Sequence, residues 1–194
     1  SDIDPSLPNV KIEILGPPPT SGTRDAFHEL FMEPGAEKIP ALAALRKSDR
    51  KAFDTVWKSI RKDGAYVEAG ENDNVIVQKL EANRNAFGIF GYSFLEENTA
   101  KLRGVPINGI EPEYDPIAAG KYAGSRPLFI YVKKQHVGVI PGLDKFVAEY
   151  VSPKAMSKDG YLALKGLISL PPEEAKKIAA DATAMKTLTA ADVK

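Results

Sequence analysis

The sequence predicts an α/β fold, because strand patterns alternate with helix patterns along the chain. Residues 10–15, VKIEIL, alternate apolar and charged side chains, as in a strand with one buried face. Phe27, Leu30 and Phe31 follow at the i, i+3, i+4 spacing of an amphipathic helix. Residues 128–132, LFIYV, are apolar throughout, which is typical of a strand buried within a sheet.

The loop between the first strand and the first helix has a distinctive composition. Residues 16–22, GPPPTSG, contain three prolines, which remove backbone donors and fix the chain, so we expect a stiff loop. The helix after this loop is expected to end at Pro34 and Gly35.

The next segment predicts a second helix. Ser48 is its expected cap, and the helix should end near Asp63 and Gly64. Its apolar face has helical spacing and consists of Phe53, Val56, Trp57 and Ile60.

Short strands and polar turns follow. Residues 66–68 predict a strand, and the polar turn at 70–74 leads into a helix over 75–80. Residues 86–92 combine apolar side chains with two glycines, which indicates a buried strand that another segment approaches closely, followed by a brief helix.

The last third of the chain predicts mainly helix. Residues 103–124 are rich in Gly, Pro and Asn and read as an irregular connection. Two helical segments are expected after residue 132: one with Leu143, Phe146, Val147 and Tyr150 on a single face, and one opened by residues 171–174, PPEE.

The composition excludes several classes of function. The 26 Lys and Arg residues are balanced by 26 Asp and Glu residues, and the chain has no Cys and two His. A net charge of zero gives no broad basic surface for nucleic acid or an anionic membrane, and no apolar run approaches the roughly 18 residues of a membrane span. Because Cys is absent and the His residues are far apart in sequence, we expect no metal site and no cofactor.

Residues 20–24, TSGTR, are the best candidate for a binding site. A turn of small residues at a helix start exposes backbone N–H groups where the helix dipole is positive, and hydroxyls and an Arg add directional donors. The pattern therefore fits an oxyanion cradle. It also fits an ordinary helix start capped by Ser21 or Thr23, with Arg24 on the solvent face.

Other local motifs are weaker. The sequence disfavours a nucleotide P-loop, because five residues separate Gly16 from Gly22 and Thr23 stands where the motif needs Lys. Asn72 and Asp73 form a second polar cluster at a helix start, where capping is the more common role than ligand contact.

Four segments, taken together, resemble the phosphate-binding protein of the high-affinity phosphate ABC transporter, the PstS family. They stand in the same order as in that family: GPPPTSGTRDAF at 16–27, GENDNVIVQKLEANRNAFGIFGYSFLEEN at 70–98, SRPLFIYVKK at 125–134 and GYLALKGLISLP at 160–171. The resemblance implies a type II periplasmic binding protein, in which two α/β lobes, with mixed sheets flanked by helices, hold phosphate between them.

The resemblance also implies which residues bind phosphate. In that family a Ser-Gly-Thr triplet donates hydroxyl and amide groups to phosphate, which corresponds here to Ser21, Gly22 and Thr23. An Arg is a further ligand; many members carry it four residues before the Ser, where this chain has Pro17, and a subgroup carries it where this chain has Arg24. Thr20, Asn72 and Asp73 are additional candidates.

Members of the family are considerably longer than this chain, and the segment that begins their first lobe has no counterpart here. We therefore expect residues 1–124 to form the second lobe, incomplete at its start, and residues 125–194 to form the returning segment of the first lobe. In the family the absent segment carries an acidic residue that accepts the phosphate proton and repels fully deprotonated sulfate. Without it, we expect weak or absent phosphate binding.

The expected function is therefore that of a solute receptor without a catalytic step. It would capture inorganic phosphate in the periplasm and deliver it to an ABC permease of the inner membrane, with a hinge near Ser125 and Arg126. A preceding segment or a companion chain would complete the first lobe, and the signal peptide would lie outside this chain. The alternatives are another tetrahedral oxyanion as ligand, a phosphate-ester enzyme that uses the same loop, or an interaction module; the lack of an identifiable nucleophile weighs against the enzyme.

Overall fold

The computed structural model describes residues 4–190 and 192 and divides into two compact units, with the boundary between Val105 and Pro106. The predicted assignment of residues 1–124 and 125–194 to the two lobes of a binding protein stays a prediction.

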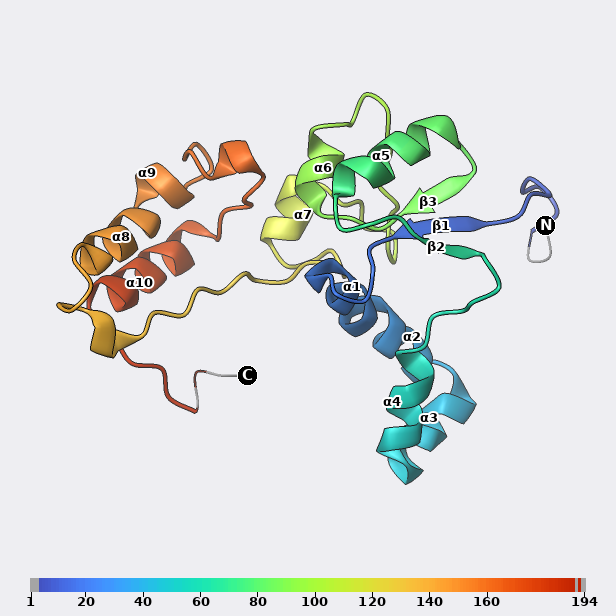
Figure 1. Ribbon diagram of the computed structural model, residues 1–194, viewed down its shortest axis with the longest axis horizontal. Helices are drawn as coiled ribbons and strands as arrows, with labels where there is room; N and C mark the ends of the chain where they lie inside the picture. The colour runs from blue at the N-terminus through green and yellow to red at the C-terminus, as the bar shows by residue number, and fades with distance from the viewer. Residues whose placement is uncertain (1–3, 191, 193–194) are drawn as a thin grey trace. The chain divides into compact units, whose positions relative to one another are not determined.

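A three-stranded parallel sheet organises the first unit. Its strands are β1 (Glu13–Gly16), β2 (Tyr66–Glu68) and β3 (Ala86–Gly88), and β1 lies in the middle (Figure 1). Ile14 of β1 is level with Tyr66 of β2. Parallel strands with helices in their connections confirm the predicted α/β class.

Helix α5 (Asp73–Ala82) packs against this sheet and forms the first core. Leu15, Ala69 and Ile76 are its buried members. A Cβ atom on Gly88 would lie only 2.6 Å from Leu80 Cδ1, so the backbone of β3 and α5 approach each other as closely as the glycine pattern predicts.

The helix after the first loop continues past its predicted end. It consists of α1 (Gly22–Phe27), the π-helical turn η1 (His28–Met32) and α2 (Glu33–Glu37). Pro34 and Gly35 lie inside α2, so the predicted stop is wrong. Pro34 stands in the first turn of α2, where a missing backbone N–H is tolerated, and the π turn before it is closed by a bond from Glu33 N–H to His28 O.

A helical hairpin of α3 (Pro40–Ser48) and α4 (Arg50–Trp57) completes this part of the unit. Phe53 and Trp57 are buried there with Ala36, as predicted for two members of the apolar face. Val56 is exposed, and Ile60 lies beyond α4, which ends at Trp57 and not near Asp63 and Gly64. The predicted cap is wrong by one residue. Asp49 has extended backbone and accepts from Ala52 N–H at 2.9 Å, whereas Ser48 still belongs to α3.

The brief helix α6 (Tyr92–Glu96) follows β3 and belongs to the first unit. The second unit is built from helices. Helix α8 contacts both α9 and α10, and Val147 of α8 and Ala155 of α9 are buried between them. The elements of this unit are α7 (Tyr114–Ala118), η2 (Lys134–His136), α8 (Leu143–Tyr150), α9 (Pro153–Met156), η3 (Ala163–Lys165) and α10 (Pro172–Thr183).

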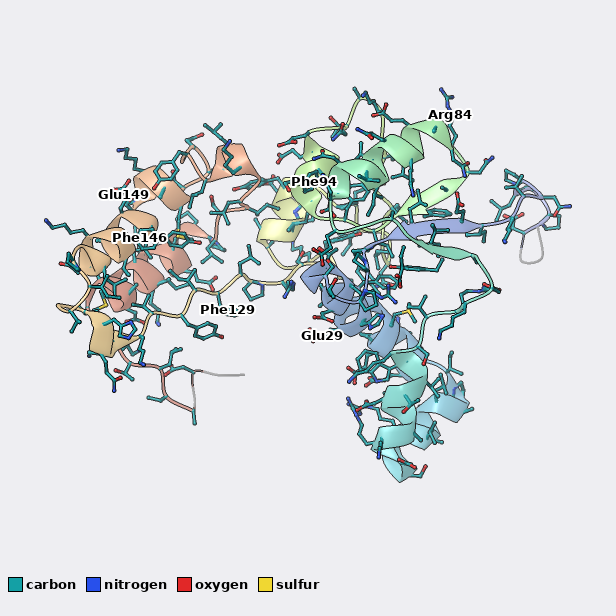
Figure 2. All side chains as sticks on the ribbon, in the orientation of Figure 1. Glu29, Arg84, Phe94, Phe129, Phe146 and Glu149 are labelled. Atoms are coloured by element: carbon teal, nitrogen blue, oxygen red, sulfur yellow. The ribbon has the colours of Figure 1, made fainter. Side chains whose placement is uncertain are left out.

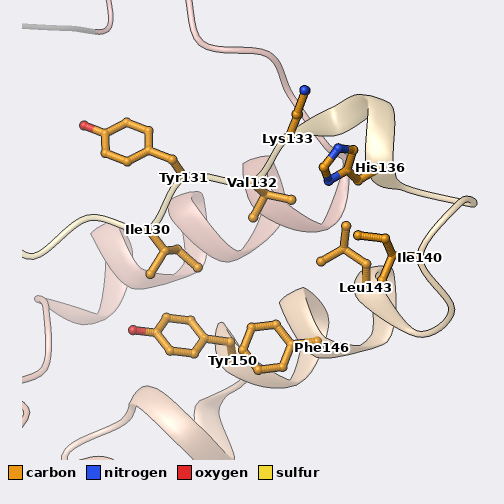
Figure 3. A pocket seen from close by; sticks show the side chains of 9 residues that line it. All are labelled: Ile130, Tyr131, Val132, Lys133, His136, Ile140, Leu143, Phe146 and Tyr150. Carbon is orange, nitrogen blue, oxygen red and sulfur yellow. The ribbon is translucent and has the colours of Figure 1, made fainter.

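The predicted buried strand at 128–132 is wrong for this structure. The segment is extended but pairs with no strand among the described residues, and Leu128, Phe129 and Tyr131 are 75%, 70% and 76% exposed. Phe129 is labelled in Figure 2. A strand forms only where a neighbouring strand can accept its hydrogen bonds. Beside the segment lies an open apolar groove of about 330 Å³, lined among others by Ile130 and Phe146 (Figure 3).

Candidate functional site

The candidate site lies where the three parallel strands of the first unit end. The loop at 17–21 follows β1, the loop at 69–72 follows β2, and residues 89–91 follow β3. In open α/β sheets, ligands bind beyond the carboxyl ends of the strands. The parallel topology thus brings the two polar clusters of the sequence to one edge of the sheet.

Ser21 begins the helical run after the first loop. Its backbone is extended, its carbonyl accepts from Arg24 N–H at 3.0 Å, and its Oγ accepts from Thr23 N–H at 3.2 Å. Of the two candidate caps, Ser21 and Thr23, the structure therefore has Ser21 as the helix cap. Because Oγ acts here as an acceptor, the hydroxyl hydrogen can still be donated to an anion, so capping and an oxyanion cradle are compatible.

Arg24 is buried and does not lie on the solvent face. The residue is only 6% exposed, and its Nη1 donates to Pro17 O and to Tyr66 Oη, both at 2.9 Å. Its Nε donates to His28 Nε2 at 3.0 Å. These contacts use three of the five N–H groups of a guanidinium, and the other two belong to Nη2.

Burial and the charge of Arg24 affect the pKa of His28. Partial burial lowers the pKa of His28, and the positive charge of Arg24 lowers this pKa further. A neutral imidazole is what the contact requires, because only an unprotonated Nε2 can accept from Arg24.

The second polar cluster lies at the start of α5. Asn72 is the helix cap and accepts from Asn74 N–H at 3.0 Å. Asp73 accepts from Gly91 N–H at 3.2 Å, and burial raises the pKa of its carboxyl. Asn72 caps α5, as the capping interpretation predicts. Asp73 does not act as a cap, because it lies inside the helix and instead joins the start of α5 to the segment after β3.

The two loops meet through Thr20. Its Oγ1 donates to Glu71 Oε1 at 2.5 Å, which joins the loop after β1 to the loop after β2. Sequence reasoning missed both Glu71 and Tyr66 as members of the site. They are distant from the loop in sequence, and only the parallel pairing of β1 with β2 places them beside it.

Two general findings apply to the described part of the chain. Within residues 4–190 and 192, no group of three or more His, Asp or Glu side chains is arranged to hold a metal ion. In the same residues, no helix has the length and apolar character needed to cross a membrane.

Comparison with known proteins finds relatives named for phosphate binding and one named SphX. The chain is 32% identical over 169 residues to "Phosphate-binding protein PstS" of Staphylococcus haemolyticus and 34% identical over 170 residues to the protein of that name from Staphylococcus epidermidis. These matches cover 84% of this chain but 45% and 43% of the relatives. "Protein SphX" of Synechococcus elongatus is 32% identical over 136 residues, which are 67% of this chain and 33% of that protein.

The chain therefore spans less than half the length of the curated relatives it matches. No solved structure gives a significant match. The relatives confirm the resemblance to the PstS family that the four sequence segments indicate. Residues 1–154 match the sequence model of the PBP superfamily domain, so the chain belongs to the PBP superfamily, the periplasmic binding proteins.

Proposed function

We propose that this chain is part of a receptor for inorganic phosphate and that residues 20–24 supply one side of the binding site. One observation carries the proposal above the others. The loop at the carboxyl edge of a parallel sheet presents Ser21, Gly22 and Thr23 at a helix start, in a chain similar to proteins named for phosphate binding.

The donors of this loop match the chemistry of the ligand. Phosphate oxygens accept hydrogen bonds, and the Ser21 and Thr23 hydroxyls are donors that need no positive surface. The Thr23 and Arg24 amides already donate to Ser21, so they would contribute mainly through the positive end of the helix dipole. The Nη2 group of Arg24 would add a charge-assisted donor. Thr20, Asn72 and Asp73 stay further candidates, although each already contacts a protein group.

The proposal involves binding and release, with no catalytic step. Phosphate would be captured in the periplasm and passed to an ABC permease, and closure would use a hinge near Ser125 and Arg126. An esterase built on Ser21 would need a general base. The Nε2 atom of the nearby His28 is occupied by its bond from Arg24 Nε, which weighs against that role.

Further polypeptide would complete the site. One loop cannot surround a tetrahedral anion, and the relatives are more than twice as long as the segment they share with this chain. A preceding segment or a companion chain would supply the remaining ligands, including the acidic proton acceptor. The exposed segment 128–132 and the apolar groove beside it offer a surface for that polypeptide to cover.

The loop can be tested by deleting its hydroxyls. We expect Ser21→Ala and Thr23→Val each to weaken phosphate binding by about tenfold, since a hydrogen bond to a charged group contributes about 1.5–3 kcal/mol. Broadening of the phosphorus resonance of inorganic phosphate measures binding even when it is weak. Thr55→Val on α4, which removes an exposed hydroxyl bonded to Lys51 O, is the matched control and should leave the affinity unchanged. Equal affinities in all four proteins would refute the proposal.

A further inference from the structure

Tyr66 joins the two ends of the candidate loop. Its hydroxyl accepts from Arg24 Nη1 at 2.9 Å and donates to Pro17 O at 3.0 Å. Arg24 Nη1 also donates to Pro17 O at 2.9 Å, so the guanidinium, the phenol and the carbonyl form a closed triangle of hydrogen bonds. The guanidinium carbon additionally lies 4.7 Å from the centre of the Tyr66 ring, a cation–π distance.

The triangle fixes the loop at both ends. Pro17 is the first residue after β1, and Arg24 lies in the first turn of α1. Between them stand the three residues that the proposed function assigns to phosphate. The interior of the loop has its own bond, from Ser21 N–H to Pro18 O at 3.0 Å, but that bond does not connect the loop to the sheet.

Tyr66 supplies the connection to the sheet. It belongs to β2, which pairs with β1 in parallel register, so the phenol is anchored by the backbone of a neighbouring strand. Burial raises the pKa of Tyr66, which keeps the phenol protonated and able to donate to Pro17 O. The Pro17 side chain is itself fully buried.

The Tyr66 phenol occupies the space that a side chain at position 16 would need. A Cβ atom at Gly16 would lie 2.1 Å from Tyr66 Oη and 2.6 Å from Tyr66 Cζ. Any side chain at this position would displace the phenol from the triangle. The glycine at the end of β1 is therefore needed for the close approach of Tyr66, in addition to ending the strand.

We propose that Tyr66 is a positioning residue for phosphate binding: it holds Arg24 and the Pro17 carbonyl so that Ser21, Gly22 and Thr23 are arranged before the ligand arrives. This inference rests on the proposed function of the loop. Its physical basis is preorganisation, because a loop that is already ordered loses less conformational entropy on binding. Tyr66 itself need not touch the ligand.

The test uses the full 194-residue chain and the substitution Tyr66→Phe, which removes the hydroxyl and retains the ring, Arg24 and the loop hydroxyls. We expect phosphate affinity, measured by phosphorus resonance broadening, to fall about tenfold, because the loop loses both hydrogen bonds of the phenol and must then be ordered at the expense of binding free energy. We also expect amide hydrogen exchange at Ser21, Arg24 and Asp25 to accelerate in the absence of phosphate. Tyr161→Phe, which removes a hydroxyl bonded to Glu149 in the second unit, is the control.

Gly16→Ala provides a second variant that leaves the Tyr66 hydroxyl and Arg24 chemically intact. It should reproduce both effects of Tyr66→Phe, because the added methyl displaces the phenol. Denaturant unfolding of both variants identifies any general loss of structure. A merely structural role would lower stability and leave the phosphate affinity of the folded chain unchanged.

The outcomes separate the two proposals. Lower affinity together with faster loop exchange supports the positioning role. Unchanged affinity overturns it, as does lower affinity with unchanged exchange, because Tyr66 would then act by direct contact. If the unsubstituted chain shows no phosphate binding, the proposed function gains no support from this chain alone, and the exchange comparison still decides whether Tyr66 orders the loop.

Discussion

His28 accepts a hydrogen bond from the buried cation Arg24, so the protonation state of His28 affects this contact. Its Nε2 accepts from Arg24 Nε, and its ring meets the Trp57 ring edge-on with the centroids 6.3 Å apart. Partial burial and the charges of Arg24 and Lys58 lower the pKa of His28, while Asp25 raises it. A protonated His28 would lose the acceptor and face a second cation.

Stability should therefore depend on pH through His28. Its pKa in the folded chain lies below the ordinary value of 6.5, so between these two values the unfolded chain binds more protons and stability rises with pH. The contribution is fully present above about pH 6.5 and is lost as the pH falls through the folded pKa. Urea unfolding followed by the fluorescence of Trp57, the single Trp of the chain, measures this dependence in the first unit.

His28→Gln removes the titration and keeps a carbonyl oxygen as a candidate acceptor for Arg24. We expect this variant to lose less stability than the unsubstituted chain between about pH 6.5 and pH 5, the range in which a His changes charge. His136→Gln, in the second unit, should behave like the unsubstituted chain. Identical pH dependence in all three proteins would contradict the assigned role of His28.

At the scale of elements, substitutions of Asn72 at the start of α5 distinguish a helix cap from a phosphate ligand. Asn72 Oδ1 accepts from Asn74 N–H, so Asn72→Ala should lower the free energy of unfolding by about 1 kcal/mol. If the residue only caps the helix, phosphate affinity should stay unchanged. Asn72→Ser keeps a capping oxygen and should retain most of the stability. A loss of affinity in Asn72→Ala without a loss of stability would instead make Asn72 a ligand.

Elements with strong local patterns could be predicted from the sequence. The apolar face around Phe53 and Trp57 predicts a helix, and the alternation before Gly16 predicts β1. The failures occur where the outcome depends on neighbours. Ser48 and Asp49 both suit a cap, and in the structure Ser48 belongs to α3 while Asp49 caps α4. Residues 128–132 have the composition of a buried strand, but no described strand pairs with them.

The site shows the same division between local and long-range information. Ser21, Gly22 and Thr23 could be identified because a helix start and a hydroxyl triplet are local signals. The burial of Arg24 and its bond to Tyr66 could not, since 42 residues separate the two positions. Only the parallel register of β1 and β2 places them together, and periodicity carries no information about strand order.

For the whole molecule, the zero net charge and the share of its relatives that the chain covers both bear on how it would bind phosphate. A receptor that recognises one small anion through hydroxyls, amides and one guanidinium needs no basic surface. The chain covers less than half of its relatives, and the described first unit presents donors from one side of the proposed site. Weak binding is therefore the expected behaviour of this chain alone.

The most direct test of the phosphate site is a titration of the 15N-labelled chain with inorganic phosphate, followed by amide proton and nitrogen shifts. We predict that the shifts concentrate at Gly22, Thr23 and Arg24 and reach half of their full size at about 1 mM phosphate, which corresponds to a binding free energy of about −4 kcal/mol. Sulfate should produce similar shifts, because the acidic proton acceptor is expected outside this chain. Unshifted loop amides, or tight binding that excludes sulfate, would contradict the account.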